Sequence, residues 1–149
     1  MLFLIFKIGD ETYAIKAETV VEVVDLVNFT KIPQTPEYIS GLMNYRGSIL
    51  PVIDLPHLLL GKKYNSMLST RIILIDFVLK REKNTLGIIA ENLTETRAFD
   101  KKNIKKSGIQ LNTIPYLGRV ISDNNEIIHI LDIQKILPED LSNSLFNKK

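Results

Sequence analysis

Short apolar runs, separated by glycine, proline and polar turn residues, make up most of this chain. We expect strands at residues 2–8, 12–15, 20–27, 42–45, 48–53, 71–79, 86–90, 119–122 and 126–131. Many of these runs are rich in β-branched residues, which favour the extended backbone. Many short strands with turn signals between them are typical of small barrels rather than of a sandwich. The pattern therefore predicts an all-β protein with a few short helices.

The segment over residues 39–61 organises this prediction. Residues 42–45 form a short strand, and Arg46-Gly47 then marks a tight turn, because glycine accepts positive φ without steric cost. The apolar run that follows the turn predicts a second strand. Asp54 stands where a helix N-cap is expected, and Gly61 stands just past the helix end. The segment is thus a strand, a turn, a strand and a short helix.

The chain also repeats itself. Residues 12–22 align with residues 85–95, an offset of 73 positions, and Asp54 with its following leucines matches Asp132 at an offset of 78. A unit of about 70 residues is marginally stable alone. We therefore expect the two copies to pack together as one cooperative unit.

Composition excludes several classes of protein. The hydrophobic fraction is 45% and the charged fraction 24%, which is ordinary for a globular domain. A net charge of +2 is too small to indicate a nucleic acid or an anionic membrane as a partner. The absence of cysteine excludes disulfides, a thiol nucleophile and cysteine-ligated zinc. The apolar start of the chain predicts a strand, not a signal peptide, and no apolar run reaches the ~18 residues of a membrane span.

Titratable residues give weak signals for catalysis. His57 and His129 could suggest a metal pair, but no third ligand stands at metal spacing beside either. Asp54 and Asp132 could form an acid–base pair. Each ends an apolar strand before a short helix, so helix capping is the better interpretation. We expect no catalytic residue, no metal and no cofactor.

A basic stretch keeps one alternative open. Lysines occur at positions 101, 102, 105 and 106, within a polar segment over residues 100–113 that we expect to be a mobile loop. The stretch lacks interleaved aromatic residues, so a solvated loop is the favoured interpretation. A nucleic-acid-binding module on SH3-like barrels nevertheless remains an alternative class of function.

A longer motif within the segment over residues 39–61 resembles the signature of a known protein family. Gly41-x-x-Asn44-x-Arg46-Gly47-x-x-x-Pro51-Val52-Ile53-Asp54-Leu55 resembles the signature of the CheW family, the adaptors of bacterial chemosensory arrays. Tyr45 stands where the family usually has leucine, and Ala90-Glu91 stands where it usually has Val-Asp. The resemblance spans residues 4–137. It implies two five-stranded SH3-like β-barrels packed side by side, with a hydrophobic groove between them.

The resemblance also implies a division of the chain. Residues 1–149 would form a single CheW-like domain, with one sub-barrel over approximately 12–69 and the second over approximately 70–137. The strand at residues 2–8 could pair with either. Residues 138–149 would form a C-terminal tail, which we expect to be frayed or weakly helical after Leu141.

Function follows from the resemblance as an expectation. It implies a non-enzymatic, cytoplasmic adaptor that couples the tip of a chemoreceptor to the regulatory domain of a CheA-type histidine kinase; an adaptor of a pilus-motility or other chemosensory-like pathway would share the motif. The residues expected to bind the receptor are Arg46, Glu22, Val20, Gly41, Asn44 and Gly47. We further expect Glu22 and Val20 to share one face of their strand. The resemblance identifies no kinase-binding residues.

Overall fold

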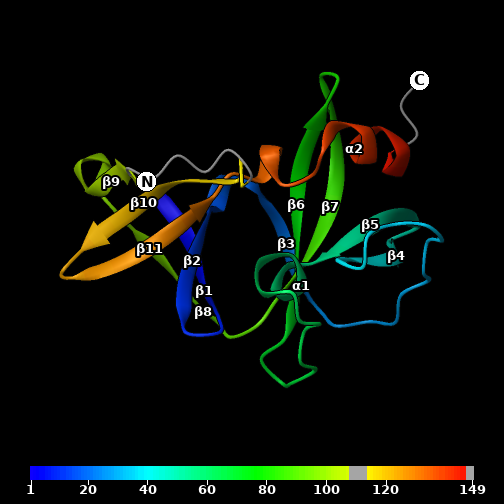
Figure 1. The fold of residues 1–149 in the computed structure, drawn as a ribbon, viewed down its shortest axis with the longest axis horizontal. Coiled ribbons are helices and arrows are strands. Elements are labelled where there is room, and N and C mark those ends of the chain that lie inside the picture. Colours follow the sequence, from blue (N-terminus) through cyan, green and yellow to red (C-terminus); the bar gives the residue numbers. More distant parts are fainter. Residues whose placement is uncertain (108–113, 147–149) are drawn as a thin grey trace.

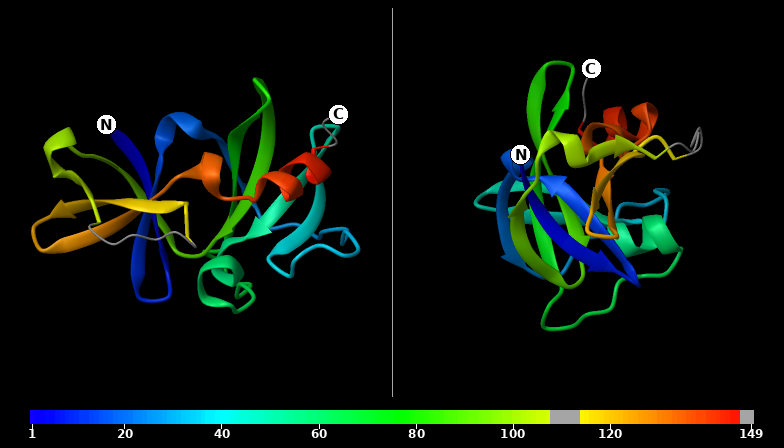
Figure 2. Two further views of the ribbon diagram at one scale, coloured as in Figure 1. Left: turned by 45° about the horizontal axis from the view of Figure 1, so that its top comes forward. Right: turned by 90° about the vertical axis from the view of Figure 1, so that its left-hand side faces the viewer.

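Two β-sheets lie side by side along the long axis of the molecule (Figures 1 and 2). The structure is a computed structural model, and it describes residues 1–107 and 114–146. The six-stranded sheet has the order β8-β1-β2-β11-β10-β9, with β1 at Leu2–Ile8, β2 at Glu11–Lys16, β8 at Leu93–Ala98, β9 at Ile104–Lys106, β10 at Leu117–Asp123 and β11 at Glu126–Leu131. The five-stranded sheet has the order β3-β6-β7-β5-β4, with β3 at Val20–Asp25, β4 at Ile39–Tyr45, β5 at Ser48–Asp54, β6 at Arg71–Leu79 and β7 at Glu82–Ala90.

Helices are short and lie between or after the strands. The α-helices are α1 at Leu55–Leu60 and α2 at Glu139–Leu145, and the 3-10 turns are η1 at Ala17–Thr19, η2 at Lys101–Asn103 and η3 at Ile133–Lys135. None of the helices in the described part of the chain is long and apolar enough to cross a membrane. The predicted all-β class with a few short helices is confirmed. The sheets differ from the predicted pair of closed five-stranded barrels, since one has six strands and both are open.

The predicted boundary between two sub-barrels at residues 69–70 is wrong. Strand β2 belongs to the six-stranded sheet, where it runs parallel to β11, and β7 belongs to the five-stranded sheet, where it runs parallel to β5. Strand β1 pairs with β2 and also with β8. Each sheet therefore combines a hairpin from one copy of the repeat with the remaining strands of the other copy. Sequence offsets detect the repeat, whereas this exchange depends on pairing between distant segments.

A single apolar core joins the two sheets. It includes Phe6 and Ile15 from the six-stranded sheet together with Ile53, Ile73 and Ile88 from the five-stranded sheet, all fully buried. These side chains pack the two sheets together. The expected joint packing of the two copies is confirmed, and the hydrophobic groove that the resemblance implied between them stays a prediction.

Two polar segments are more ordered than their composition predicts. The first part of the predicted mobile loop forms η2 and then β9, which pairs with β10, while residues 108–113 lie outside the described residues. The predicted tail forms α2, and the ring of Phe146 stacks on Phe77 with centroids 5.4 Å apart. Leu141 and Leu145 pack on the shared core beside it. Burial of these apolar side chains explains why a short polar segment is helical.

Candidate functional site

The turn between β4 and β5 is a two-residue hairpin loop. Tyr45 pairs with Ser48, and the loop residues Arg46 and Gly47 have φ values of 51° and 85°. Two successive positive φ angles define a type I′ turn, which matches the twist of the flanking strands. The side-chain oxygen of Asn44 accepts a hydrogen bond from the Gly47 N–H at 3.1 Å. The predicted turn is confirmed, and Asn44 and Gly47 both serve to shape it.

Arg46 is fixed in direction yet remains accessible. Its Nη2 lies 3.4 Å from Glu22 Oε1, and its guanidinium carbon lies 5.2 Å from the centre of the Tyr45 ring. The side chain is still 75% exposed. A guanidinium carries five donors in a planar fork, and a single carboxylate at this distance leaves most of them available. The turn therefore presents an oriented cation to solvent.

Tyr45 links this cation to the opposite edge of the sheet. Strands β3 and β4 are the two outer strands, yet the Tyr45 hydroxyl donates a hydrogen bond to Glu22 Oε2 across the gap between them. This hydrogen bond is the main reason that the pKa of Tyr45 is raised. Thr30 and Leu42 close the same gap with two backbone hydrogen bonds, at 3.0 and 2.7 Å. Glu22, Tyr45 and Arg46 thus form one cluster across the gap between the outer strands β3 and β4, here called the seam of the five-stranded sheet.

Sequence reasoning treated Tyr45 only as a departure from the family motif. One feature of the sequence could have indicated its role: Tyr45 directly precedes the turn residue Arg46, whose guanidinium lies over the Tyr45 ring. Its contact with Glu22 could not be inferred, since 23 positions separate the two residues. The structure assigns Tyr45 to the cluster.

Val20 does not share a face with Glu22. The register of β3 against β6 shifts between these residues, with Val20 opposite Ile75 and Glu22 opposite Leu74. This bulge inserts Val21 as an extra residue and reverses the alternation of the strand. Val20 packs on the core shared by the sheets, while Glu22 lies on the other face. The predicted common face is therefore wrong.

Gly41 has a structural requirement of its own. Its φ is 137°, and an added Cβ would stand 2.3 Å from the Thr30 carbonyl oxygen. Only glycine allows the segment before β4 to approach this closely. Gly41 therefore acts on the hairpin through the backbone and does not present a side chain at the surface.

The predicted helix caps are confirmed. Asp54 accepts hydrogen bonds from the N–H groups of His57 and Tyr64, both at 3.1 Å, and Asp132 accepts one from Gln134 at 3.2 Å. Gly61 ends α1 in the left-handed conformation with φ of 74°. Burial raises the pKa of Asp54, although the two N–H groups oppose this shift.

The two histidines lie in different elements, His57 in α1 and His129 in β11, and have separate acidic neighbours. His57 Nε2 is 3.6 Å from Glu37, and His129 Nε2 is 3.8 Å from Glu11. Over residues 1–107 and 114–146, no three His, Asp or Glu side chains are grouped so that they could hold a metal ion.

Comparisons with known proteins agree on one family. The family model described as the CheW-like domain matches residues 2–141. The chain is 31% identical over 143 residues to a chemotaxis protein CheW of Helicobacter pylori, covering 93% of this chain and 82% of the relative. It is 30% identical over 138 residues to Protein FrzA of Myxococcus xanthus, covering 91% and 84%. The crystal structure of the scaffolding protein TtCheW from Thermoanaerobacter tengcongensis superposes with a TM-score of 0.79 at 28% identity, covering 92% and 87%. This chain belongs to the CheW family of chemotaxis coupling adaptors.

Proposed function

We propose that this chain couples chemoreceptors to a CheA-type histidine kinase in a bacterial chemosensory array, and that Arg46 contacts the receptor. Membership of the CheW family supports the adaptor role. The observation that carries the receptor assignment is the Arg46 side chain, which is 75% exposed although Glu22 and Tyr45 fix its direction. A pre-oriented guanidinium loses less entropy on binding than a free one.

The hairpin offers more than a charge. Ile49, the second residue after the turn, is 62% exposed and pairs with Asn44 on the outward face. An exposed apolar side chain on the same hairpin as an oriented cation suits an amphipathic helix, which provides an apolar stripe flanked by carboxylates or exposed polar groups. The helical cytoplasmic tip of a chemoreceptor is such a partner. Arg46 would set the orientation and Ile49 would supply apolar area.

The kinase would bind at a separate surface, so that one adaptor joins two partners. Tethering many such contacts in an array raises their effective concentration, and each contact can remain weak and reversible. In this role the protein acts in the cytoplasm at membrane-associated receptors and catalyses no reaction.

A capture experiment tests the assignment of Arg46. Arg46→Glu should abolish capture of the receptor cytoplasmic fragment, because it reverses the presented charge beside Glu22. Capture of the kinase and the circular dichroism spectrum should be unchanged. Arg81→Glu is the matched control, since Arg81 is an exposed arginine with φ of 66° in the turn between β6 and β7. Unchanged receptor capture by Arg46→Glu would contradict the proposal.

A charge exchange separates contact from hairpin support. The double variant Glu22→Arg with Arg46→Glu restores an ion pair across the seam but places the cation on β3. If Arg46 touches the receptor, the double variant remains unable to capture it. If Arg46 serves only to hold the hairpin, receptor capture recovers, and the proposed contact is wrong.

A further inference from the structure

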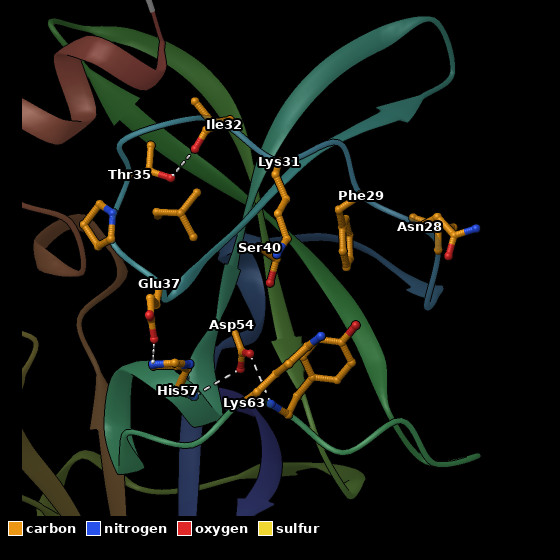
Figure 3. Close-up of a pocket in the computed structure, with 14 residues that line it drawn as sticks. Asn28, Phe29, Lys31, Ile32, Thr35, Glu37, Ser40, Asp54, His57 and Lys63 are labelled. Atoms are coloured by element: carbon orange, nitrogen blue, oxygen red, sulfur yellow. Dashed lines mark hydrogen bonds and ion pairs between the residues drawn. The ribbon is translucent and has the colours of Figure 1, made fainter.

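A second surface feature lies on the five-stranded sheet and is separate from the Arg46 cluster. The segment over residues 27–40 and the start of α1 enclose a hollow of about 710 Å³, here called the Lys31 groove (Figure 3). Its lining includes Phe29, Lys31, Ile39 and Tyr64. The volume falls within the range of ligand sites in proteins, roughly 300–1,000 Å³.

The walls of the Lys31 groove are held by hydrogen bonds and do not depend on a ligand. Thr30 and Leu42 tie the outer wall to β4, and the Thr35 hydroxyl donates to the Ile32 carbonyl at 2.8 Å. On the other side, buried Asp54 accepts the Tyr64 N–H. Because both walls are anchored, the groove is preformed, and binding requires little reordering.

The charges that line the groove are unequally engaged. The Asp54 carboxylate accepts two backbone N–H groups, and Glu37 lies 3.6 Å from His57. Lys31, by contrast, forms no ion pair with any residue of the described ranges, and Figure 3 shows its side chain reaching into the hollow towards Ser40. Lys63 lies at the rim, 5.5 Å over the Tyr64 ring. Among the charged lining residues, which all fall in the described part of the chain, Lys31 is therefore the one without an ion-pair, hydrogen-bond or aromatic partner.

We propose that the Lys31 groove binds an extended acidic peptide segment of a partner protein. A Glu or Asp carboxylate of the segment would meet the Lys31 ammonium, and a neighbouring aromatic or branched side chain would pack between Phe29 and Tyr64. Several lining residues, Lys31, Pro36, Glu37 and Lys63 among them, are exposed, so the mouth is wide. A wide mouth suits a chain that enters and leaves the groove better than it suits an enclosed small molecule. This proposal does not depend on the receptor assignment of Arg46.

Two synthetic peptides of matched size test the charge preference. The full chain labelled with ¹⁵N is titrated with acetyl-Glu-Phe-Glu-amide and with acetyl-Lys-Phe-Lys-amide. The acidic peptide should shift the backbone amides of Phe29, Lys31 and Tyr64, and the basic peptide should not. Equal shifts by the two peptides, or shifts confined to another surface, would overturn the proposal. Benzoate is the third probe, and shifts by benzoate at an affinity equal to that of the acidic peptide would identify a small-anion site instead.

A pair of lysine variants tests whether Lys31 contacts the acidic peptide. Lys31→Ala should weaken binding of the acidic peptide about tenfold, the effect of losing one charge-assisted contact. Lys83→Ala removes an exposed lysine of β7 outside the groove and should leave the affinity unchanged. Since both lysines are exposed, both variants are expected to fold, which the unperturbed spectrum of each would verify. An equal loss of affinity in the two variants would indicate non-specific electrostatic attraction and contradict binding in the Lys31 groove.

Discussion

The β4–β5 and β10–β11 hairpins occupy opposite ends of the molecule and correspond in sequence at an offset of 78 positions (Figure 1). Both turns contain two successive residues with positive φ, Arg46-Gly47 in one and Asn124-Asn125 in the other. The second residue after each turn is an exposed isoleucine, Ile49 at 62% and Ile127 at 59%. The two hairpins are therefore the same structural unit with different side chains.

Each hairpin forms an ion pair with an outer strand of its own sheet, β3 in one and β8 in the other, but the charges are reversed. In the five-stranded sheet the acid is on β3 and the cation is on the turn. In the six-stranded sheet the cation is Arg97 on β8, and it lies 3.5 Å from Asp123 and 3.4 Å from Glu126 on the hairpin. Arg97 also lies 4.7 Å over the Phe99 ring and is 29% exposed.

This difference distinguishes an arginine that stabilises its sheet from one that is available to bind a partner. Both ion pairs join an outer strand, β3 or β8, to a hairpin of the same sheet, so this link alone does not require either polarity. Only the first arrangement leaves a cation at the tip of the hairpin, with one carboxylate neighbour. Arg97 is surrounded by acidic groups and withdrawn, so it stabilises its sheet without facing a partner.

The largest expected effect concerns the close approach beside the first hairpin. Gly41→Val should destabilise the fold by at least about 3 kcal/mol, because a side chain would collide with the Thr30 backbone at an unfavourable φ. The equivalent residue of the second hairpin is Arg119, which is exposed, and Arg119→Val should change stability by less than about 0.5 kcal/mol. Urea denaturation measures both. Similar losses would show that the two seams are equally crowded.

The two helix caps give the next difference. Asp54→Ala should cost about 2 kcal/mol, because two N–H groups lose their acceptor in a buried position. Asp132→Ala should cost less than about 1 kcal/mol, since one N–H loses its acceptor near solvent. The same denaturation measurement ranks them. A larger cost at Asp132 would contradict the assigned burial.

We expect Arg97 to contribute more to the stability of the fold than Arg46, although only Arg46 is proposed to bind a partner. Arg97→Ala should cost about 1–2 kcal/mol, because several carboxylates lose a common partner. Arg46→Ala should cost less than about 0.5 kcal/mol, as is usual for an exposed ion pair. Thermal or urea unfolding checks the order. Equal costs would mean that Arg46 is mainly a structural residue.

The smallest effect is a dependence on pH. Burial raises the pKa of Asp54 in the folded state, so the folded protein holds this proton more tightly than the unfolded chain. The resulting stability is present below the unfolded pKa of about 3.9 and is lost as pH rises through the folded pKa. Relative to Asp54→Asn, the natural protein should therefore lose stability as the pH rises above the unfolded pKa of about 3.9. A relative gain over this range would show that the two N–H groups outweigh burial.

Local chemistry made much of the fold predictable. The Arg46-Gly47 turn, the Asp54 cap and the Gly61 helix end each depend on a few neighbouring residues, and each is confirmed. The exchange of hairpins between sheets was not predictable, because pairing of β2 with β11 depends on segments more than 100 positions apart. No local pattern encodes such a choice.

The candidate site shows the same division. The Arg46-Gly47 turn follows from local chemistry and Asn44 was indicated by the family motif, whereas the position of Val20 was wrong because one bulge at Val21 reverses the alternation of β3. The Glu22–Tyr45 contact crosses between outer strands and has no sequence signal. What a strand faces beyond its bulge is decided by tertiary packing.

The exchanged hairpin also has a consequence during protein synthesis. The β1–β2 hairpin ends at Lys16, but its parallel neighbour β11 begins at Glu126. At about 5–20 residues per second, a ribosome needs roughly 5 to 20 seconds to make the intervening chain. The nascent hairpin must wait that long with Phe3 and Ile5 uncovered, so newly made copies are most vulnerable to chaperone capture or aggregation before the last strand emerges.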